Sequence, residues 1–341
     1  MKTKTIICLV SRQAMANVIP VLELKPQKVI LLITKEEELV AINLKKLFNK
    51  YNVETVIFNK KLDAYNIDKV KKVCMDVIRE SDDEVILNLT GGTKTMAVAA
   101  YEIFRSVDKK IIYHNPVGRK LIFLNPLNHT DIEVSIAINV EDYLLAHGYK
   151  ITEEKTSSGM AEKYIKLFKN FDKSRFSDFI DFYNYAKKEI KLEDPKVSKQ
   201  FKDFNFSKSY DKITLIDKKN NIKLNFSLSG FNFGDWLECL LFTILKEKHK
   251  PDDIKYSVKV EKDGIISEID VMFTKDCCLY LYSCKDKKKT TKSDIYEIEV
   301  LRNVTGGTFG KANLVLTNDN PYLVSFGKQI NINTFNIKEL F

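Results

Sequence analysis

The sequence predicts an α/β protein with two domains, the first of them built on a parallel β-sheet. The chain has 341 residues, about two domains at roughly 150 residues per domain. Its apolar fraction of 44% is ordinary for a globular protein. Short β-branched runs alternate with helix-period stretches over about the first 125 residues, which is typical of a parallel sheet covered on both faces. We therefore predict a Rossmann-like α/β domain in this part of the chain.

Each element of this domain is predicted from its own pattern. Strands are expected where an apolar, β-branched run is continuous, and helices where apolar residues recur every three or four positions. A turn at Pro116–Gly118 separates the last two strands. In chain order the expected strands are Ile6–Val10, Lys28–Thr34, Val53–Phe58, Glu84–Leu89, Lys110–His114 and Leu121–Phe123, and the expected helices are Ala14–Leu24, Glu36–Tyr51, Ile67–Arg79 and Thr95–Ser106.

The alternation stops near Ile132, and the pattern beyond it is weaker. A short helix is expected at Glu141–Gly148, ended by its glycine, and a break at Ser157–Gly159. Ala161–Ile190 has the composition of a charged helical stretch, whereas Asp194–Phe226 has no firm assignment. A second α/β unit follows, with helices at Asp235–Lys248 and Ser293–Asn303 and strands at Tyr256–Val260, Ile265–Phe273, Leu279–Ser283 and Ala312–Thr317. The expected divisions are residues 1–130, a helical linker region at 131–230, and a domain at 231–341.

Composition excludes some classes of protein and favours others. No apolar run approaches the ~20 residues that a membrane-spanning helix needs, and the apolar run Thr5–Val10 is too short for a secretory signal. The six cysteines show neither CxxC spacing nor a zinc pattern with the four histidines, so we expect reduced thiols in a cytoplasmic protein. The 55 Lys and Arg residues exceed the 46 Asp and Glu residues, and the net charge of +9 favours anionic partners such as nucleic acid.

Small polar residues follow two of the predicted strands, where parallel sheets bind their ligands. Ser11-Arg12-Gln13 follows the first strand, and Thr90-Gly91-Gly92-Thr93-Lys94-Thr95 follows the fourth and leads into a helix. Glycines allow close backbone approach, threonine hydroxyls donate hydrogen bonds, and the lysine is positively charged, which suits a phosphate or phosphodiester. The spacing fits neither a P-loop nor the GxGxxG fingerprint. The alternative is a Gly-Gly turn with threonine as the helix N-cap.

Together the two loops resemble those of the CARF sensor domain of CRISPR-associated ancillary proteins. Such domains are Rossmann-like dimers that bind a cyclic oligoadenylate across the dimer interface, because a two-fold symmetric ring needs two identical half-sites. The resemblance implies a homodimer with cyclic tetra-adenylate as its activator. Thr34 and Asn115, at the ends of other strands, are weaker candidates for ring contacts. The residues implied to line the ring are Ser11, Arg12, Gln13, Thr90, Gly91, Gly92, Thr93, Lys94 and Met96.

Three features of the second α/β unit also carry a resemblance. Glu238 lies on the predicted helix in GDWLECLL, Asp270 on a strand in SEIDVMF, and Ser283-Cys284-Lys285 ends the next strand in YLYSCK. A helical acid, a strand acid and an SxK on the adjacent strand resemble the core of the PD-(D/E)xK nucleases, which have a restriction-endonuclease-like fold. Because strand residues alternate faces, Ser283 and Lys285 share one face, toward Asp270.

This resemblance implies a role for each residue. Glu238 and Asp270, with the backbone carbonyl of Cys284, would hold a divalent metal, Mn²⁺ or Mg²⁺, against the scissile phosphate. The metal would activate water and neutralise the charge that develops on the phosphate. Lys285 would orient or deprotonate the water and stabilise the pentavalent phosphate.

Ser283 is the largest departure from this family's pattern, which usually has Glu at that place. Related cores tolerate Gln or Ser there, and Glu268, two residues before Asp270 on the same strand face, is a candidate for the missing carboxylate. The alternative is that these acids are solvated charges and the site is inactive. The lysine-rich turn Lys285–Lys292 offers phosphate contacts, although such a run is as often only a solvated loop. Trp236 is expected to pack in the core rather than to stack on a base.

The GDWLE helix start and the tail YEIEVLRNVTGGTFGKANLVLT resemble CARF-linked nucleases of the DUF1887 type. The resemblances imply a metal-dependent endonuclease of type III CRISPR defence that a cyclic oligoadenylate activates. Its expected substrate is DNA, which it would cut as a single strand or nick in a duplex, and RNA is a further candidate. No membrane partner is expected. The ring would favour a closed dimer that brings the nuclease lobes into a competent cleft. The alternative is a non-catalytic sensor that binds nucleic acid through a degenerate nuclease fold.

Overall fold

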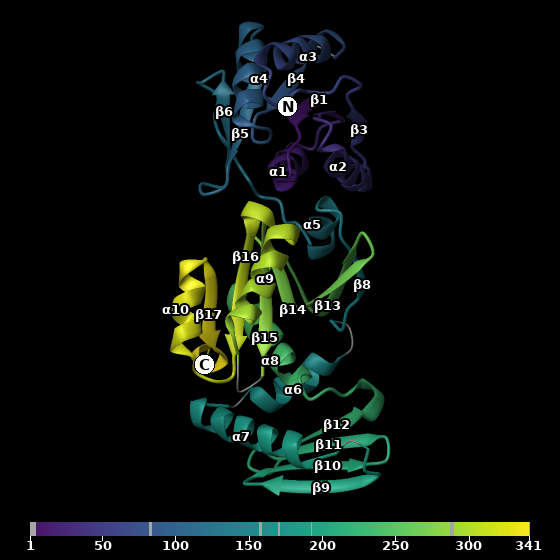
Figure 1. Cartoon of the computed structure of the whole chain (residues 1–341), viewed down its shortest axis with the longest axis vertical. Coiled ribbons are helices and arrows are strands. Elements are labelled where there is room, and N and C mark those ends of the chain that lie inside the picture. Colours follow the sequence, from purple (N-terminus) through teal and green to yellow (C-terminus); the bar gives the residue numbers. More distant parts are fainter. Residues whose placement is uncertain are drawn as a thin grey trace.

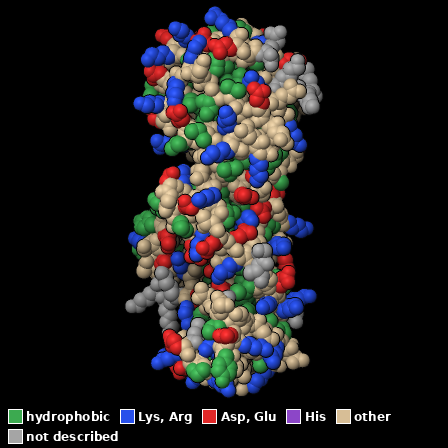
Figure 2. Space-filling view, turned by 90° about the vertical axis from the view of Figure 1, so that its right-hand side faces the viewer, with side chains coloured by type: hydrophobic (Ala, Val, Ile, Leu, Met, Phe, Trp, Pro, Cys, Tyr) green, Lys and Arg blue, Asp and Glu red, His purple; other side chains and the backbone are tan. Residues whose placement is uncertain are grey.

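The computed structural model describes residues 5–81, 84–156, 159–169, 171–191, 193–286 and 290–340. Ser157 and Ser158 of the expected break, and Lys287, Lys288 and Lys289 of the lysine-rich turn, lie outside these residues. Figure 1 shows an elongated molecule with a seven-stranded sheet at one end, a six-stranded sheet in the middle and a four-stranded sheet at the other end. Lys and Arg side chains are spread along the whole length of the face in Figure 2.

The seven-stranded sheet and its helices occupy residues 5–133. Their bounds are β1 (Thr5–Leu9), α1 (Met15–Leu24), β2 (Lys28–Leu32), α2 (Glu38–Lys50), β3 (Glu54–Ile57), α3 (Ile67–Arg79), β4 (Val85–Asn88), α4 (Lys94–Ser106), β5 (Lys110–Asn115), β6 (Lys120–Asn125) and β7 (Ile132–Glu133). The strand order is β3-β2-β1-β4-β5-β6-β7, with β1 to β5 parallel and β6 and β7 as an antiparallel edge. Alternate β1 residues pack against α1 and α2 on one face and against α3 and α4 on the other. The Rossmann-like fold is therefore confirmed.

Helices α3 and α4 begin at side-chain caps. Asn66 Oδ1 accepts a hydrogen bond from the Lys69 N–H at 3.0 Å. Thr93 Oγ1 accepts one from the Met96 N–H at 3.2 Å. Each cap satisfies one of the N–H groups that the start of a helix leaves unpaired. The threonine N-cap given as the alternative for this loop is present at Thr93, and it fixes where the loop after β4 ends.

The six-stranded sheet has the order β17-β16-β15-β14-β13-β8. Its elements are α5 (Val140–Ala146), β8 (Lys150–Glu153), α8 (Asp235–His249), β13 (Asp253–Lys262), β14 (Ile265–Lys275), β15 (Cys278–Lys285), α9 (Lys292–Thr305), β16 (Gly310–Leu316), α10 (Pro321–Gln329) and β17 (Ile332–Asn336). Strands β13, β14 and β15 form an antiparallel meander, and β15, β16 and β17 are parallel. The predicted elements of this unit are present, whereas β8, α10 and β17 were not predicted.

Between β8 and α8 the chain forms a middle region of two helices and a four-stranded antiparallel sheet. The elements are α6 (Met160–Phe168), α7 (Lys173–Glu189), β9 (Lys196–Phe201), β10 (Phe204–Ser209), β11 (Lys212–Asp217) and β12 (Ile222–Ser227). The expected helical linker at 131–230 therefore needs correction. The predicted stretch Ala161–Ile190 is two helices because Asp172 caps the second, accepting the Arg175 N–H at 2.7 Å. The four strands escaped prediction because lysines such as Lys208 interrupt their alternation.

Trp236, at the start of α8, joins the middle region to the six-stranded sheet. Its side chain is fully buried, and its ring centroid lies 5.4 Å from that of Phe179 and 5.9 Å from that of Phe176, both on α7. The same hydrophobic cluster includes Phe204 of β10 and Val271 of β14. The predicted core packing of Trp236 is confirmed, and the middle region shares its core with the sheet beside it.

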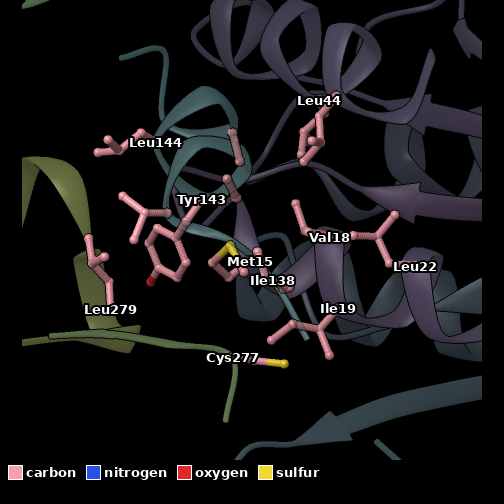
Figure 3. Packing of buried hydrophobic residues seen from close by; sticks show 14 of the residues in the cluster. Met15, Val18, Ile19, Leu22, Leu44, Ile138, Tyr143, Leu144, Cys277 and Leu279 are labelled. Carbon is pink, nitrogen blue, oxygen red and sulfur yellow. The ribbon is translucent and has the colours of Figure 1, made fainter. Parts of the chain in front are cut away.

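A second shared core joins the seven-stranded sheet to the six-stranded one. Figure 3 shows Met15 of α1 and Tyr143 of α5 close to Cys277 and Leu279, which lie at the turn before β15 and within it. All four residues are buried and belong to one cluster. The two sheets are therefore packed against each other rather than joined by a free linker.

The fold contains neither a membrane-spanning helix nor a disulfide among the described residues. No helix among the described residues is both long and apolar enough to cross a membrane. All six cysteines are free thiols. Burial raises the pKa of the Cys8 and Cys74 thiols to about 12, so both are protonated at neutral pH.

Candidate active site and sensor loops

A cavity of about 150 Å³ on the six-stranded sheet collects most of the predicted catalytic residues. Asp270 comes from β14, and Ser283 and Lys285 come from the end of β15. The structure brings these three together on one face, as strand alternation predicts. Their catalytic roles stay predictions. The lining residues are Glu268, Ile269, Asp270, Tyr282, Ser283, Lys285, Glu297, Ile298 and Leu301.

Asp270 is held in place by the neighbouring strand. Its Oδ2 accepts hydrogen bonds from the Cys284 backbone N–H at 2.5 Å and from Ser283 Oγ at 3.3 Å. Burial raises the pKa of Asp270, while the Cys284 N–H and the nearby Lys285 ammonium act in the opposite direction. An ionised glutamate at position 283 could not donate this second hydrogen bond, because it carries no proton. Serine therefore fixes the orientation of the Asp270 carboxylate.

Glu238 lies in the first turn of α8 and is not among the described residues that line the cavity. Its Oε2 atom is buried and has no hydrogen-bond partner among the described residues. Burial, together with the nearby carboxylates of Asp270 and Asp235, raises the pKa of Glu238 to about 8. A buried acid next to like charges is a place where a bound cation offsets an unfavourable charge.

Lys155 is a neighbour of Glu238 that the sequence did not reveal. Lys155 follows β8 in the chain. Its Nζ forms an ion pair with Asp235 Oδ1 at 3.0 Å, and its charge lowers the pKa of Glu238. Asp235 is itself buried and accepts the Asn232 N–H at 3.2 Å. Lys155 and Asp235 are 80 residues apart in the chain, and no local pattern joins them.

Glu297 is a second residue that sequence reasoning missed, and it enters the cavity from α9. Lys285 Nζ lies 3.4 Å from Glu297 Oε2 and 3.9 Å from Asp294 Oδ1. No local signal marks it, because only the packing of α9 on the sheet brings Glu297 beside Lys285. The ammonium of Lys285 therefore pairs with the acids of α9, while its charge also lowers the pKa of Asp270.

The carboxylates of this site fit the divalent metal that the resemblance implies only in part. No group of three or more His, Cys, Asp or Glu side chains in the described part of the chain is placed to hold a metal ion. Magnesium, however, is commonly bound by one or two carboxylates together with water and substrate phosphate. The unpartnered, buried Oε2 of Glu238 and its repulsion by Asp270 fit a divalent ion between these two side chains. Glu268, which lines the same cavity, is available as a third carboxylate.

The raised pKa of Glu238 predicts how stability changes with pH when no metal is bound. Between the ordinary value of 4.5 and about 8, the folded chain holds a proton that the unfolded chain has lost. The free energy of unfolding should therefore fall as pH rises through this window, by at most about 1.4 kcal/mol per unit. Glu238→Gln should remove this slope and be more stable than the wild type at pH 8.

Denaturant unfolding in a chelator from pH 5 to 8.5 measures this slope. Glu247→Gln, an exposed change on the same helix, should follow the wild type. Equal slopes for wild type and Glu238→Gln would show that Glu238 titrates normally.

The two predicted ligand loops lie side by side in the seven-stranded sheet. Strand β1 pairs with β2 on one side and β4 on the other, so the loops after β1 and β4 meet at the switch point where such sheets bind ligands. Asn88 Nδ2 donates to Asn17 Oδ1 at 3.0 Å, and Asn17 Nδ2 donates to the Leu9 carbonyl at 3.1 Å. Asn88 Oδ1 also accepts from Thr90 Oγ1 at 2.7 Å. Sequence reasoning missed both asparagines, although an Asn at the end of an apolar strand was a usable signal.

The second loop depends on its glycines. A Cβ atom on Gly91 would lie 2.2 Å from the Leu9 carbonyl oxygen, and Gly92 has a φ of +81°. Only glycine allows this close approach to β1. Two positive charges lie at the loops: Arg12, whose side chain is 87% exposed, and Lys94, which is exposed at the start of α4.

Some of the predicted ring contacts are placed elsewhere. Met96 is buried in the core, 1% exposed, and Thr34 is also buried. Asn115 Oδ1 accepts two N–H groups of its own hairpin turn, each at 3.2 Å. Gln13 Oε1 accepts the Thr308 N–H of the six-stranded unit at 3.0 Å. Contacts of a ring with Ser11, Arg12, Gln13, Thr90, Gly91, Gly92, Thr93 and Lys94 stay predictions.

A Rossmann-like domain whose glycine loop lies at the switch point, followed by a sheet that carries the Asp270 and Lys285 cavity, is the arrangement expected of a sensor domain joined to a nuclease-like domain. The family comparisons agree with this class. Residues 5–143 match the family model of the Card1 CARF domain, and residues 228–339 match that of the Card1-like endonuclease domain. Its N-terminal part is therefore similar to the Card1 CARF domain and its C-terminal part to the Card1-like endonuclease domain, and the resemblance stated from its motifs is confirmed.

Solved structures share this fold at low sequence identity. Can2 from Sulfobacillus thermosulfidooxidans, in complex with cyclic tetra-adenylate, has a TM-score of 0.74 and 20% identity over 98% of this chain and 94% of its own. Protein VC1899 from Vibrio cholerae has a TM-score of 0.78 and 19% identity over 99% and 96%. A type III CRISPR defence DNA nuclease activated by cyclic oligoadenylate has a TM-score of 0.58 and 18% identity over 93% and 46%. No curated protein matches the chain.

Proposed function

We propose that the chain is a metal-dependent endonuclease of type III CRISPR defence that a cyclic oligoadenylate activates. Cyclic tetra-adenylate is the proposed ring. The proposed substrate is DNA, which the chain would cut as a single strand or nick in a duplex. RNA is a second candidate. The observation that carries the proposal is the cavity in which Asp270, Ser283 and Lys285 meet, within a Card1-like endonuclease domain. The cyclic tetra-adenylate bound to Can2, which shares the fold, supports the choice of ring.

The chain's own residues have separate tasks in phosphodiester hydrolysis. Lys285 brings a positive charge to the phosphate and orients the attacking water. Asp270 faces the same cavity with its carboxylate oriented by Ser283 and by the Cys284 N–H. A divalent ion, Mn²⁺ or Mg²⁺, held by Glu238, Asp270 and the Cys284 carbonyl would supply further neutralisation of the charge on the reacting phosphate. The Cys284 thiol takes no part, because burial raises its pKa well above the ordinary value.

The charge distribution supports a nucleic-acid substrate. Residues 160–230 hold 16 Lys and Arg residues against 10 Asp and Glu residues, which accounts for most of the net charge of +9. This basic middle region reaches the catalytic strand, since Lys187 Nζ of α7 lies 3.9 Å from Asp286 Oδ2, one residue after Lys285. A positive surface beside the cavity attracts the phosphate backbone of a substrate strand.

The geometry of the sensor loops supports a ring as activator. Arg12 and Lys94 place positive charge beside the backbone of the glycine loop at the switch point, where a phosphodiester is favoured. A cyclic tetra-adenylate with two-fold symmetry would bind two such sites from two copies of this chain, so we propose a homodimer. Ring binding that favours one arrangement of the dimer would then set the activity of both nuclease domains.

The proposal is tested by cleavage of single-stranded DNA, supercoiled plasmid and RNA, with Mn²⁺ or Mg²⁺, in the presence and absence of cyclic tetra-adenylate. We expect rapid cleavage only with both metal and ring, and no more than a low basal rate when the ring is left out. A chelator should return the rate to background, and excess metal should restore it. Cleavage at the same rate without the ring would contradict the proposed regulation.

A non-catalytic sensor that binds nucleic acid is the second candidate function. It is favoured by Ser283 in place of the usual Glu and by the absence of a three-residue metal group in the described part of the chain. Under this alternative the chain binds the ring but cleaves no substrate.

Substitutions at Ser283 discriminate between the two functions. If the chain is an active nuclease, Ser283→Ala should lower the ring-activated rate by less than about tenfold, because it removes one hydrogen bond to Asp270. Ser283→Glu should give no gain, because it places a second carboxylate against Asp270. A large gain of cleavage in Ser283→Glu, measured beside the wild type on plasmid DNA, would instead favour the degenerate site.

A further inference from the structure

Residues Gly306–Phe309, directly after α9, connect the sensor loops to the nuclease cavity, and we call this segment the joint loop. Its Thr308 N–H donates to Gln13 Oε1 at 3.0 Å, across 295 residues of sequence. The contact is close, since a Cβ atom added to Gly307 would lie 2.5 Å from the same Oε1. The loop after β1 therefore rests directly on the joint loop.

The loop after β4 reaches the joint loop through His114. Thr90 Oγ1 accepts the His114 N–H at 2.8 Å. The His114 ring stacks on Phe309 with 6.0 Å between centroids. Burial lowers the pKa of His114 to about 4, so its ring is neutral near pH 7 and the contact is one of packing. Both predicted ligand loops thus lead to the same four residues.

On its other side the joint loop continues α9, which carries the acids that pair with Lys285. The Gly306 N–H donates to the Arg302 carbonyl at 2.9 Å, so the helical hydrogen bonds run into the joint loop. Earlier in the same helix, Glu297 Oε2 lies 3.4 Å from Lys285 Nζ. A hydrogen-bonded helix shifts as a unit, so a displacement of the joint loop changes how Glu297 meets Lys285.

We propose that the hydrogen bond from Thr308 to Gln13 is a latch that holds α9 where Glu297 pairs with Lys285, and that the ring opens it. This inference rests on the proposed function and names the residues of its regulation. The Gln13 side chain cannot lie against Thr308 and turn toward a ring at the same time, so a ring that recruits Gln13 breaks this hydrogen bond. Gln13 is thus a positioning residue that acts on Lys285 through a helix. Because coupling is reciprocal, a change that opens the latch must also tighten ring binding.

Gly307→Ala tests the latch without removing any ligand-binding side chain. The added methyl displaces the flexible end of Gln13 and leaves it free for the ring. We expect ring-free cleavage to rise about two- to tenfold, the range that one hydrogen bond supports, and ring affinity to rise by the same factor. Thr308→Ala is the matched control, because the donor is a backbone N–H that alanine keeps. It should match the wild type in both measurements.

Gln13→Ala opens the latch from the other side and covers any folding defect of Gly307→Ala at its φ of +54°. It should raise ring-free cleavage in the same way but not tighten ring binding, since a proposed ring contact is lost. Ring affinity is measured by titration calorimetry with cyclic tetra-adenylate. Unchanged affinity and unchanged or lower ring-free cleavage in Gly307→Ala would overturn the latch. If the wild type binds the ring but cleaves no substrate, the proposed nuclease function is wrong, but the latch is still tested. In that case the ring affinity of Gly307→Ala, compared with the wild type, decides whether the latch exists.

Discussion

Asp270→Asn is expected to lower ring-activated cleavage by at least about 10²–10³-fold, the range found when a group that stabilises the reacting charge is removed. Asparagine has the shape of aspartate and keeps a carbonyl oxygen that can accept the Cys284 N–H, so the strand pairing is retained. The variant loses the negative charge proposed to hold the metal. Lys285→Met, which keeps much of the side chain's length without its charge, should have an effect of similar size. Initial rates on plasmid DNA at saturating ring and metal measure both.

Asp263→Asn provides the matched control. Asp263 is exposed in the turn between β13 and β14 and lies outside the cavity lining. Asp263→Asn should cleave as the wild type does, and both Asp263→Asn and Asp270→Asn should bind the ring with wild-type affinity. An Asp270→Asn protein that is folded and keeps more than about a tenth of the wild-type rate would place the chemistry elsewhere.

Arg175→Leu is expected to lower the free energy of unfolding by about 3–5 kcal/mol, the cost of leaving a buried charge unpaired. Arg175 of α7 is 6% exposed and pairs with Asp217, which is fully buried at the end of β11. Its guanidinium also lies 4.0 Å from the Phe204 ring centroid, so packing is lost together with the ion pair. Urea unfolding followed by Trp236 fluorescence reports this directly, because Trp236 lies in the same aromatic core.

Arg79→Leu is the surface control for this change. The Arg79 side chain is 71% exposed, and its guanidinium lies 4.0 Å from Asp76 Oδ1, which makes a weak ion pair. Its loss should therefore lower the free energy of unfolding by less than about 0.5 kcal/mol. The double variant Arg175→Leu/Asp217→Asn should recover part of the lost stability by removing the unpaired charge. Equal stability of Arg175→Leu and Arg79→Leu would show that the buried pair contributes nothing net.

Most of the sensor fold and its loops could be predicted from sequence because their signals are local. Continuous apolar runs mark the parallel strands, and Gly91 and Gly92 mark a backbone that must approach β1 closely. The meeting of Asp270 with Lys285 was predictable for the same reason, since alternation along two adjacent strands fixes which side chains share a face.

Other parts of the site could not be predicted, because tertiary packing alone creates them. Lys155 meets Asp235 across 80 residues, and Glu297 reaches Lys285 from a helix whose angle no local pattern fixes. The four-stranded sheet of the middle region was not predicted for a different reason. Lys208 occupies an inward position of β10, with its Nζ bonded to the Asp194 carbonyl, so a charged residue stands where the pattern needs an apolar one.

The six-stranded sheet pairs β8 with β13, which is far later in the chain, and this sets an order of assembly during protein synthesis. All strands of the seven-stranded sheet have left the ribosome once residue 133 emerges. Strand β8, in contrast, waits for β13, whose Lys259 pairs with Glu153 across 106 residues. The cavity needs β14, β15 and α9, which come later still. Since domains of a nascent chain fold as they emerge, the strands of the CARF domain pair with one another before the cavity of the endonuclease domain exists.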